Sequence, residues 1–182
     1  FDTPVIVKMC TRVSHSQSVV ETHERITPPA RPYIKNIQKN VMMPGNAKKK
    51  HPLVEARTRA LAEYAETAPL NRIEWGSREL GIITSSTSYQ YVKEVFGQDA
   101  SVLKLGMVYP MPDKLIREFA AGVKKLAVVE ELDPIIENHC RLLGLSPAGK
   151  DILPLEDEYS QNLIAAAFGR PVPQGKKLDE PI

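Results

Sequence analysis

The feature that most constrains the fold is an alternation of short apolar segments with longer amphipathic ones after residue 79. The apolar segments have the length and composition of buried strands and lie at residues 80–84, 102–108 and 126–129. Each is followed by a segment with helical spacing of its apolar residues, which ends at Gly97, Gly122 or Gly144. Strands that are joined by helices run parallel, with right-handed connections. We therefore expect an α/β fold of three layers, α/β/α, with an open and mostly parallel sheet.

The region before this alternation is rich in proline and predicts a connector followed by one helix. Prolines recur through residues 25–52, so neither a long helix nor a central strand is expected there. The basic run Lys48-Lys49-Lys50 is short, and we favour a solvated loop over a phosphate or RNA patch there. Residues 53–68 then repeat apolar side chains on one helical face, with Pro52 and Pro69 as the expected limits of the helix.

The two ends of the chain predict further elements. Residues 4–10 have the apolar pattern of a strand, so a chain starting at Phe1 opens in mid-strand and is expected to be an internal piece of a larger multidomain enzyme. Residues 72–75 predict a short edge strand, and residues 156–168 predict a last helix. The prolines and charges of residues 170–182 are typical of an interdomain linker.

Composition excludes several classes of function. The net charge is +2, from 24 basic and 22 acidic residues, so the one-sided basic excess of a nucleic-acid surface is missing. No apolar run is long enough to span a membrane. Cys10 and Cys140 each sit in an apolar pattern, which predicts buried thiols in a reducing, cytoplasmic setting and neither a disulfide nor a metal site.

Ligands of open α/β sheets bind at the carboxyl ends of the strands, and the first such end carries several hydroxyls. Residues 84–88 read Thr-Ser-Ser-Thr-Ser and contain no glycine. Phosphate-binding turns need glycines so that backbone N–H groups can approach the anion. We therefore favour helix capping by these hydroxyls over a nucleotide site.

The carboxyl end of the third strand carries the acidic residues Glu130, Glu131 and Asp133. Neighbouring carboxylates can bind Mg²⁺ or act as acid and base. Asp133, however, is expected to cap the following helix, with Pro134 at its first position. For Glu130 and Glu131 we favour salt bridges to a neighbouring domain, and Tyr109 on the preceding loop is a further candidate for the same interface.

The turn after the first apolar segment contains Thr11, Arg12, Ser14 and His15. A guanidinium, two hydroxyls and an imidazole at the end of a strand suit a carboxylate or a phosphate. A capped turn without any ligand explains the same residues equally well, and both interpretations stay open.

Two stretches of the sequence together resemble a known family. The first runs from Pro4-Val5-Ile6-Val7 through Thr11 to Ser16. The second runs from Gly81 to Ser85, through Leu105-Gly106-Met107-Val108-Tyr109-Pro110-Met111-Pro112, to Val128-Val129-Glu130-Glu131-Leu132-Asp133-Pro134. In this order they are similar to the larger subunit of the indolepyruvate-oxidising members of the 2-oxoacid:ferredoxin oxidoreductase family.

The resemblance implies a division of the chain. Residues 1–24 would be the last strand and exit turn of a pyrimidine-binding domain, and residues 25–70 a proline-rich connector with a helix. Residues 71–148 would form a domain like the C-terminal domain of transketolase. Residues 149–182 would be a C-terminal helix and a linker to a cofactor domain.

The resemblance also implies an activity for the parent enzyme: oxidative decarboxylation of an aryl pyruvate to an acyl-coenzyme A, with electrons passing to ferredoxin. Thiamine diphosphate, Mg²⁺ and 4Fe-4S clusters would be its cofactors, and a smaller subunit its partner. This sequence lacks the family's Gly-Asp-Gly signature and its clustered cysteines, which are expected beyond Ile182. The resemblance implies a position near the cofactor or substrate only for the turn with Thr11, Arg12, Ser14 and His15.

The function expected from the sequence is therefore that of a scaffold and interface domain, inactive alone and without a cofactor of its own. Two alternatives remain open. One is a free-standing α/β module that binds a nucleotide or coenzyme. The other is a module that docks an electron carrier.

Overall fold

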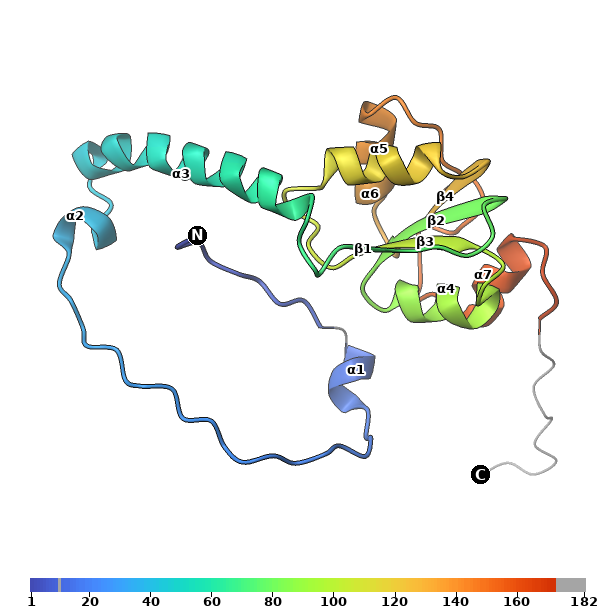
Figure 1. Cartoon of the computed structure of the whole chain (residues 1–182), viewed down its shortest axis with the longest axis horizontal. Coiled ribbons are helices and arrows are strands. Elements are labelled where there is room, and N and C mark those ends of the chain that lie inside the picture. The colour runs from blue at the N-terminus through green and yellow to red at the C-terminus, as the bar shows by residue number, and fades with distance from the viewer. Residues whose placement is uncertain (10, 173–182) are drawn as a thin grey trace. The chain divides into compact units, whose positions relative to one another are not determined.

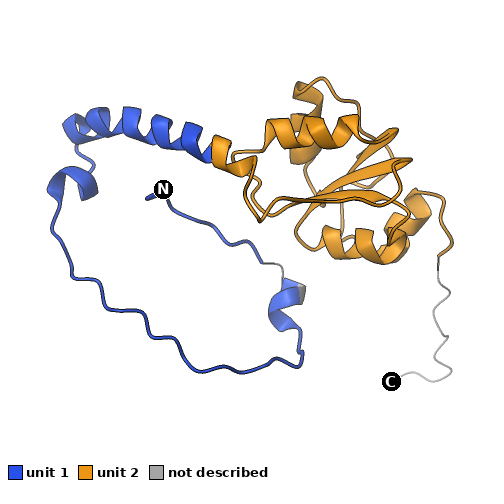
Figure 2. Cartoon of the chain, in the orientation of Figure 1, with its two compact units in different colours: residues 1–61 blue, residues 62–182 orange. Residues whose placement is uncertain are grey.

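The computed structural model describes residues 1–9 and 11–172, and it divides the chain into two units, residues 1–61 and residues 62–182 (Figure 2). Each unit is described by itself. In the described part of the chain no helix has the length and apolar character that crossing a membrane requires.

The first unit consists mainly of extended chain and helices. Its elements are α1 (Thr11–His15), α2 (Ile37–Asn40) and most of α3 (Pro44–Ala65) (Figure 1). The strand predicted at residues 4–10 is wrong for residues 4–9, and Cys10 lies outside the described residues. A strand needs a neighbour to pair with, and Ile6 here is 92% exposed.

The helix predicted at residues 53–68 corresponds to α3, which begins earlier and also ends earlier than predicted. It begins at Pro44, a residue suited to the first helical position because its missing N–H would be unpaired there anyway. It continues through Pro52, which removes only one backbone donor, and it includes the lysine run predicted as a loop. Of its predicted apolar face, Leu53 is exposed and only the last turn is covered, with Ala65 buried.

The second unit is built on a sheet of four strands: β1 (Arg72–Glu74), β2 (Leu80–Ser85), β3 (Ser101–Leu105) and β4 (Lys125–Val129). Their order is β1-β3-β2-β4. The central strand β2 pairs in parallel with β3 and β4, with Ile82 opposite both Val102 and Ala127. The antiparallel strand β1 borders β3 at the edge. The predicted open, mostly parallel sheet with an edge strand is confirmed.

Four helices cover the two faces of the sheet: α4 (Ser88–Phe96), α5 (Asp113–Ala121), α6 (Ile135–Leu142) and α7 (Gln161–Ala167). Figure 1 shows α4 and α7 on one face, with α5 and α6 on the other. Neighbouring residues of a strand point to opposite faces, so Ile82 packs in the core beside Phe96 and Ile83 in the core beside Phe119. The predicted three-layer α/β/α fold is confirmed.

The chain after α6 belongs to the same folded unit. Ala148 pairs with Ala127 beside β4, so that this edge of the sheet is partly covered. Tyr159 and Ile164 are fully buried in the core under α4, and Ser160 caps α7 by accepting a hydrogen bond from the Leu163 N–H (3.2 Å). The folded unit thus extends past residue 148, where the sequence placed a boundary.

Candidate functional site

The turn singled out near residue 11 forms the short helix α1. Thr11, Ser14 and His15 are exposed on it, while the side chain of Arg12 is outside the described part of the structure. No described strand precedes this helix. A cofactor role for these four residues therefore stays a prediction.

The carboxyl ends of β2, β3 and β4 meet at one edge of the sheet because the three strands are parallel. Thr84 is fully buried there, and its hydroxyl donates to the Val129 carbonyl (2.8 Å), which ties β2 to β4. Thr87 occupies the N-cap position of α4 but makes no side-chain capping bond to that helix. The capping that we expected from these hydroxyls is thus not seen at Thr87.

Glu130 caps α6. Its two carboxylate oxygens accept hydrogen bonds from the N–H groups of Ile136 (2.8 Å) and Glu137 (2.9 Å). The N-cap position belongs to Pro134, which offers no side-chain acceptor, so the prediction that Asp133 caps this helix is wrong. A carboxylate at the positive end of a helix is favourable, and Glu130 is only 7% exposed. Glu130 therefore faces the interior of the fold, and its predicted salt bridge to a neighbouring domain stays a prediction.

Lys150 holds the loop after α6 against the same corner. Its ammonium donates to the carbonyl of Glu130 (2.7 Å), the carbonyl of Pro154 (3.3 Å) and the hydroxyl of Tyr159 (2.6 Å). The backbone N–H of Lys150 donates to the buried carboxylate of Glu137 (2.9 Å), which also pairs with Arg141. All three ammonium protons thus have an acceptor, and the corner is closed by internal bonds.

Burial dominates the acid–base behaviour of this corner. It raises the pKa of Glu130 even though two backbone N–H groups favour the charged form, and it raises the pKa of Tyr159 to about 12. It lowers the pKa of Lys150. Burial, reinforced by Glu130 and Glu137, raises the pKa of the Cys140 thiol to about 12. At neutral pH the thiol is protonated and the phenol neutral, so neither serves as a nucleophile.

Glu131 makes a structural contact of the same kind. One carboxylate oxygen accepts a hydrogen bond from the backbone N–H of Tyr159 (2.9 Å). Unlike Glu130, Glu131 is only half-buried. Its predicted role at an interface stays a prediction.

The loop after β3 is anchored by Asn71. The Asn71 carbonyl oxygen accepts from the N–H groups of Gly106 (3.0 Å) and Met107 (2.8 Å), and its amide donates to the carbonyl of Ala65 (3.0 Å). Glu66 holds the far end of the loop by accepting from the N–H groups at the start of α5, those of Lys114 (3.1 Å) and Leu115 (2.9 Å). The base of this loop is therefore fixed at both ends.

Between these anchors the loop presents Tyr109, which is 79% exposed. Val108 beside it is also exposed, as are Leu132 on the loop that leads into α6 and Ile135 at the start of that helix. Leu132 has a backbone φ of 60°, a left-handed conformation that leucine rarely adopts. Apolar side chains thus gather on both loops of the carboxyl edge, which is typical of a surface that contacts another protein.

A second charged cluster lies at the edge strand. Glu74 accepts from Arg72 (2.8 Å) and from the hydroxyl of Tyr89 (2.7 Å), and it pairs with Lys93 (3.0 Å). Partial burial acts to raise the pKa of Glu74, but these donors lower it to about 2. The cluster ties β1 to α4.

Sequence reasoning found Tyr109, Glu130 and Glu131 but missed the residues that organise the edge. Lys150 lies in a stretch with no regular pattern, Tyr159 lies in the stretch predicted as the last helix, and Asn71 precedes a strand of only three residues. Some of the groups that they contact lie close in the chain, but others lie up to 36 residues away. The only local signal was the unusual clustering of acidic residues after β4.

The described residues do not fit the cofactors that the family implies for the parent enzyme. No three His, Cys, Asp or Glu side chains of the described chain lie together as metal ligands. Cys140, buried and with a raised pKa, is unsuited to ligate an iron–sulfur cluster as a thiolate.

Comparison with models of known protein families gives no match. Subunit IorA of indolepyruvate oxidoreductase from Archaeoglobus fulgidus is 32% identical over 93% of this chain, and the subunits from Methanothermobacter marburgensis and Thermococcus kodakarensis are 34% and 33% identical over 91%. The chain spans only 28–29% of the length of these relatives. Among solved structures, the 2-oxoglutarate:ferredoxin oxidoreductase from Magnetococcus marinus matches 59% of the chain and 20% of its own length, with 19% identity and a TM-score of 0.47.

Identity of this level, sustained over nearly the whole chain in relatives from several organisms, reflects common ancestry. The chain is therefore homologous, over at least 91% of its length, to a segment of indolepyruvate oxidoreductase subunit IorA.

Proposed function

We propose that the second unit is a scaffold and interface domain of an indolepyruvate oxidoreductase. The observation that carries the proposal is the contrast at the carboxyl edge of the sheet. The polar groups that could take part in a reaction, those of Glu130, Lys150 and Tyr159, are engaged in internal hydrogen bonds, whereas the apolar side chains of the two loops are exposed.

The internal bonds give the edge the rigidity that an interface needs. Glu130 and Lys150 hold the loop after β4, and Asn71 and Glu66 hold the loop after β3. A rigid surface loses little conformational entropy when a partner docks. Exposed aromatic side chains such as that of Tyr109 are among the kinds that contribute most to binding, and the exposed Leu132 adds apolar surface.

The partner that we propose is the smaller subunit, or another domain of the parent enzyme. The relatives are named as subunits of an oxidoreductase, which supports an assembly of more than one chain. In that assembly the parent enzyme would oxidise an aryl pyruvate to an acyl-coenzyme A and pass the electrons to ferredoxin. Thiamine diphosphate, Mg²⁺ and 4Fe-4S clusters would be held by other parts of the enzyme.

The experiment introduces substitutions at the carboxyl edge of the assembled two-subunit enzyme and measures assembly by size-exclusion chromatography. Leu132→Asn removes an apolar side chain and suits the left-handed backbone at φ 60°, because asparagine tolerates that conformation well. Tyr109→Gln removes the exposed aromatic ring. Leu142→Asn is the matched control, since Leu142 is also exposed but lies at the other end of α6.

We expect Leu132→Asn and Tyr109→Gln each to weaken assembly at least about fivefold, the effect of losing about 1 kcal/mol at an interface. Indolepyruvate-dependent electron transfer should fall in proportion to assembly, and Leu142→Asn should change neither. Assembly that is unaffected by both edge substitutions would refute the interface. Indolepyruvate-dependent turnover by this chain alone, without the second subunit, would refute the scaffold role.

A further inference from the structure

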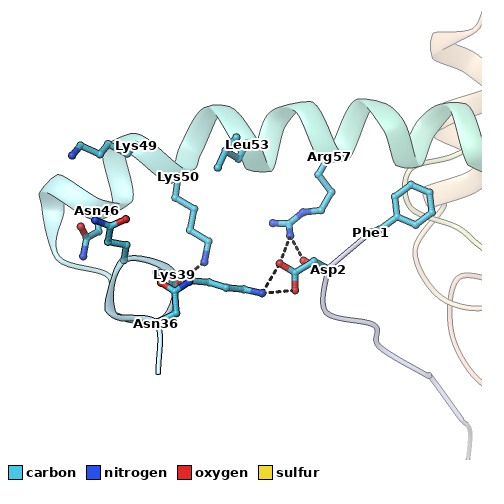
Figure 3. Close-up of a pocket in the computed structure, with 10 residues that line it drawn as sticks. Phe1, Asp2, Asn36, Lys39, Asn46, Lys49, Lys50, Leu53 and Arg57 are labelled. Atoms are coloured by element: carbon cyan, nitrogen blue, oxygen red, sulfur yellow. Dashed lines mark hydrogen bonds and ion pairs between the residues drawn. The ribbon is translucent and has the colours of Figure 1, made fainter. Parts of the chain in front are cut away.

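The first unit contains a cationic pocket that the proposed function does not use. Residues from three segments line it: the start of the chain, the region of α2, and the first half of α3 (Figure 3). Figure 3 shows Lys39 from α2 and Arg57 from α3 extending toward Asp2, while Lys50 from α3 points toward the backbone of Lys39.

An anion already occupies part of this pocket. The Asp2 carboxylate lies 2.7 Å from the ammonium of Lys39 and 3.9 Å from the guanidinium of Arg57, which also donates to the Asp2 carbonyl. Lys50 donates to the carbonyl of Lys39 (2.8 Å) and so holds α2 against α3. The hydrogen bond and the charge of Lys39 lower the pKa of Asp2. The geometry therefore selects a negatively charged group at this position.

One carboxylate does not balance the charge of the pocket. Four cationic side chains line it, those of Lys39, Lys49, Lys50 and Arg57, against the single carboxylate of Asp2. A phosphate group carries more charge than a carboxylate and a third acceptor oxygen, which suits a guanidinium and two ammonium groups together. The side chain of Asp2 is 69% exposed, so an incoming anion can reach the site and replace an ion pair of the weak, solvent-exposed kind.

We propose that this pocket binds a phosphate-bearing ligand, with the Asp2 carboxylate holding the position of a phosphate group in its absence. Phe1 and Leu53 also line the pocket and are exposed, so an apolar or aromatic body attached to the phosphate has a surface to lie on. The site lies wholly within the first unit and is independent of the interface in the second.

The test is calorimetric titration of the full chain with pyrophosphate at low ionic strength. Lys39→Gln and Arg57→Gln should each weaken binding about two- to fivefold, the range of an exposed ion pair. Asp2→Asn should strengthen it by a similar factor, because the internal competitor is gone. Lys48→Gln and Arg59→Gln are the matched controls, since both lie on α3, are exposed and do not line the pocket.

Saturable binding with this pattern, and weaker binding of succinate than of pyrophosphate, would support the site. Circular dichroism at 222 nm should be the same for all variants, which separates a lost ligand contact from a lost helix. No binding by either the unchanged chain or Asp2→Asn would overturn the proposal. Equal weakening by Lys48→Gln and Lys39→Gln would also overturn it, because it would reflect diffuse attraction, and equal affinity for succinate would overturn the preference for phosphate.

Discussion

Replacing Glu130 by alanine tests whether this residue is the capping group of α6. The change removes both acceptors of the Ile136 and Glu137 N–H groups and leaves two buried donors unpaired. An unpaired buried donor costs about 1–3 kcal/mol, and loss of a helix cap costs about 0.5–2 kcal/mol. Removing a carboxylate whose pKa is raised by burial recovers part of this cost. We expect a net loss of about 2–3 kcal/mol.

The measurement is urea denaturation at pH 7, followed by far-ultraviolet circular dichroism. The midpoint should fall while the slope with urea stays constant, because the folded state keeps its compactness. Glu118→Ala is the control, since Glu118 is exposed on α5, and its effect should stay within about 0.5 kcal/mol. A loss below about 1 kcal/mol for Glu130→Ala, no larger than that of the control, would refute the capping role.

The stability that Glu130 contributes changes with pH in a definite direction. The pKa of Glu130 is raised in the folded state, so the folded chain binds this proton more tightly than the unfolded chain. The stability from that proton is fully present below the ordinary value near 4.5 and is lost as pH rises through the raised pKa. The stability difference between the unchanged chain and Glu130→Gln should therefore narrow from pH 4.5 to pH 7.5. A widening difference would contradict burial as the dominant cause.

Three further outcomes are expected. The pKa of Glu74 is lowered to about 2, so its contribution to stability is present above about pH 4.5 and is lost as pH falls toward 2. Between these pH values the free energy of unfolding should fall less steeply in Glu74→Gln than in the unchanged chain. Equal slopes of unfolding free energy against pH would count against the cluster. Asn71→Ala breaks three hydrogen bonds and should destabilise the chain by about 2–4 kcal/mol in calorimetry, whereas the exposed Asn138→Ala should change little. In a Cys10→Ser background, Cys140 should react with a thiol reagent at pH 8 only after denaturation, because its pKa is raised to about 12, and rapid labelling of the native chain would contradict its burial.

Several features of the candidate site could be predicted from local pattern. The clustered acids after the third apolar segment pointed to Glu130 and Glu131, and the parallel sheet implied that Tyr109 shares their edge. What Glu130 does could not be predicted, because Asp133 was an equally good capping residue in sequence. The backbone of the loop after β4, with Leu132 at a positive φ, brings Glu130 rather than Asp133 to the N–H groups of α6.

The first unit shows where the sequence pattern is insufficient to predict the structure. Residues 4–9 have the composition of a strand, and residues 53–64 have an apolar stripe, yet residues 4–9 are exposed and the stripe is at most half-buried. A strand forms only with a hydrogen-bonding neighbour, and an apolar stripe is buried only when a second surface covers it. Neither neighbour belongs to the described residues, so composition alone led to the wrong structure for residues 4–9.

The sequence by itself determined the order of strands and helices from β2 to α6, the mostly parallel sheet and its three layers. These follow from periodicity within each segment and from the geometry of parallel connections, which are local or general. Only the tertiary structure decided which polar groups meet: Glu130 with α6, Lys150 with Tyr159, and Asn71 with the loop after β3. The reason is that a buried polar group must find a partner in three dimensions, and its distance along the chain sets no limit on that partner.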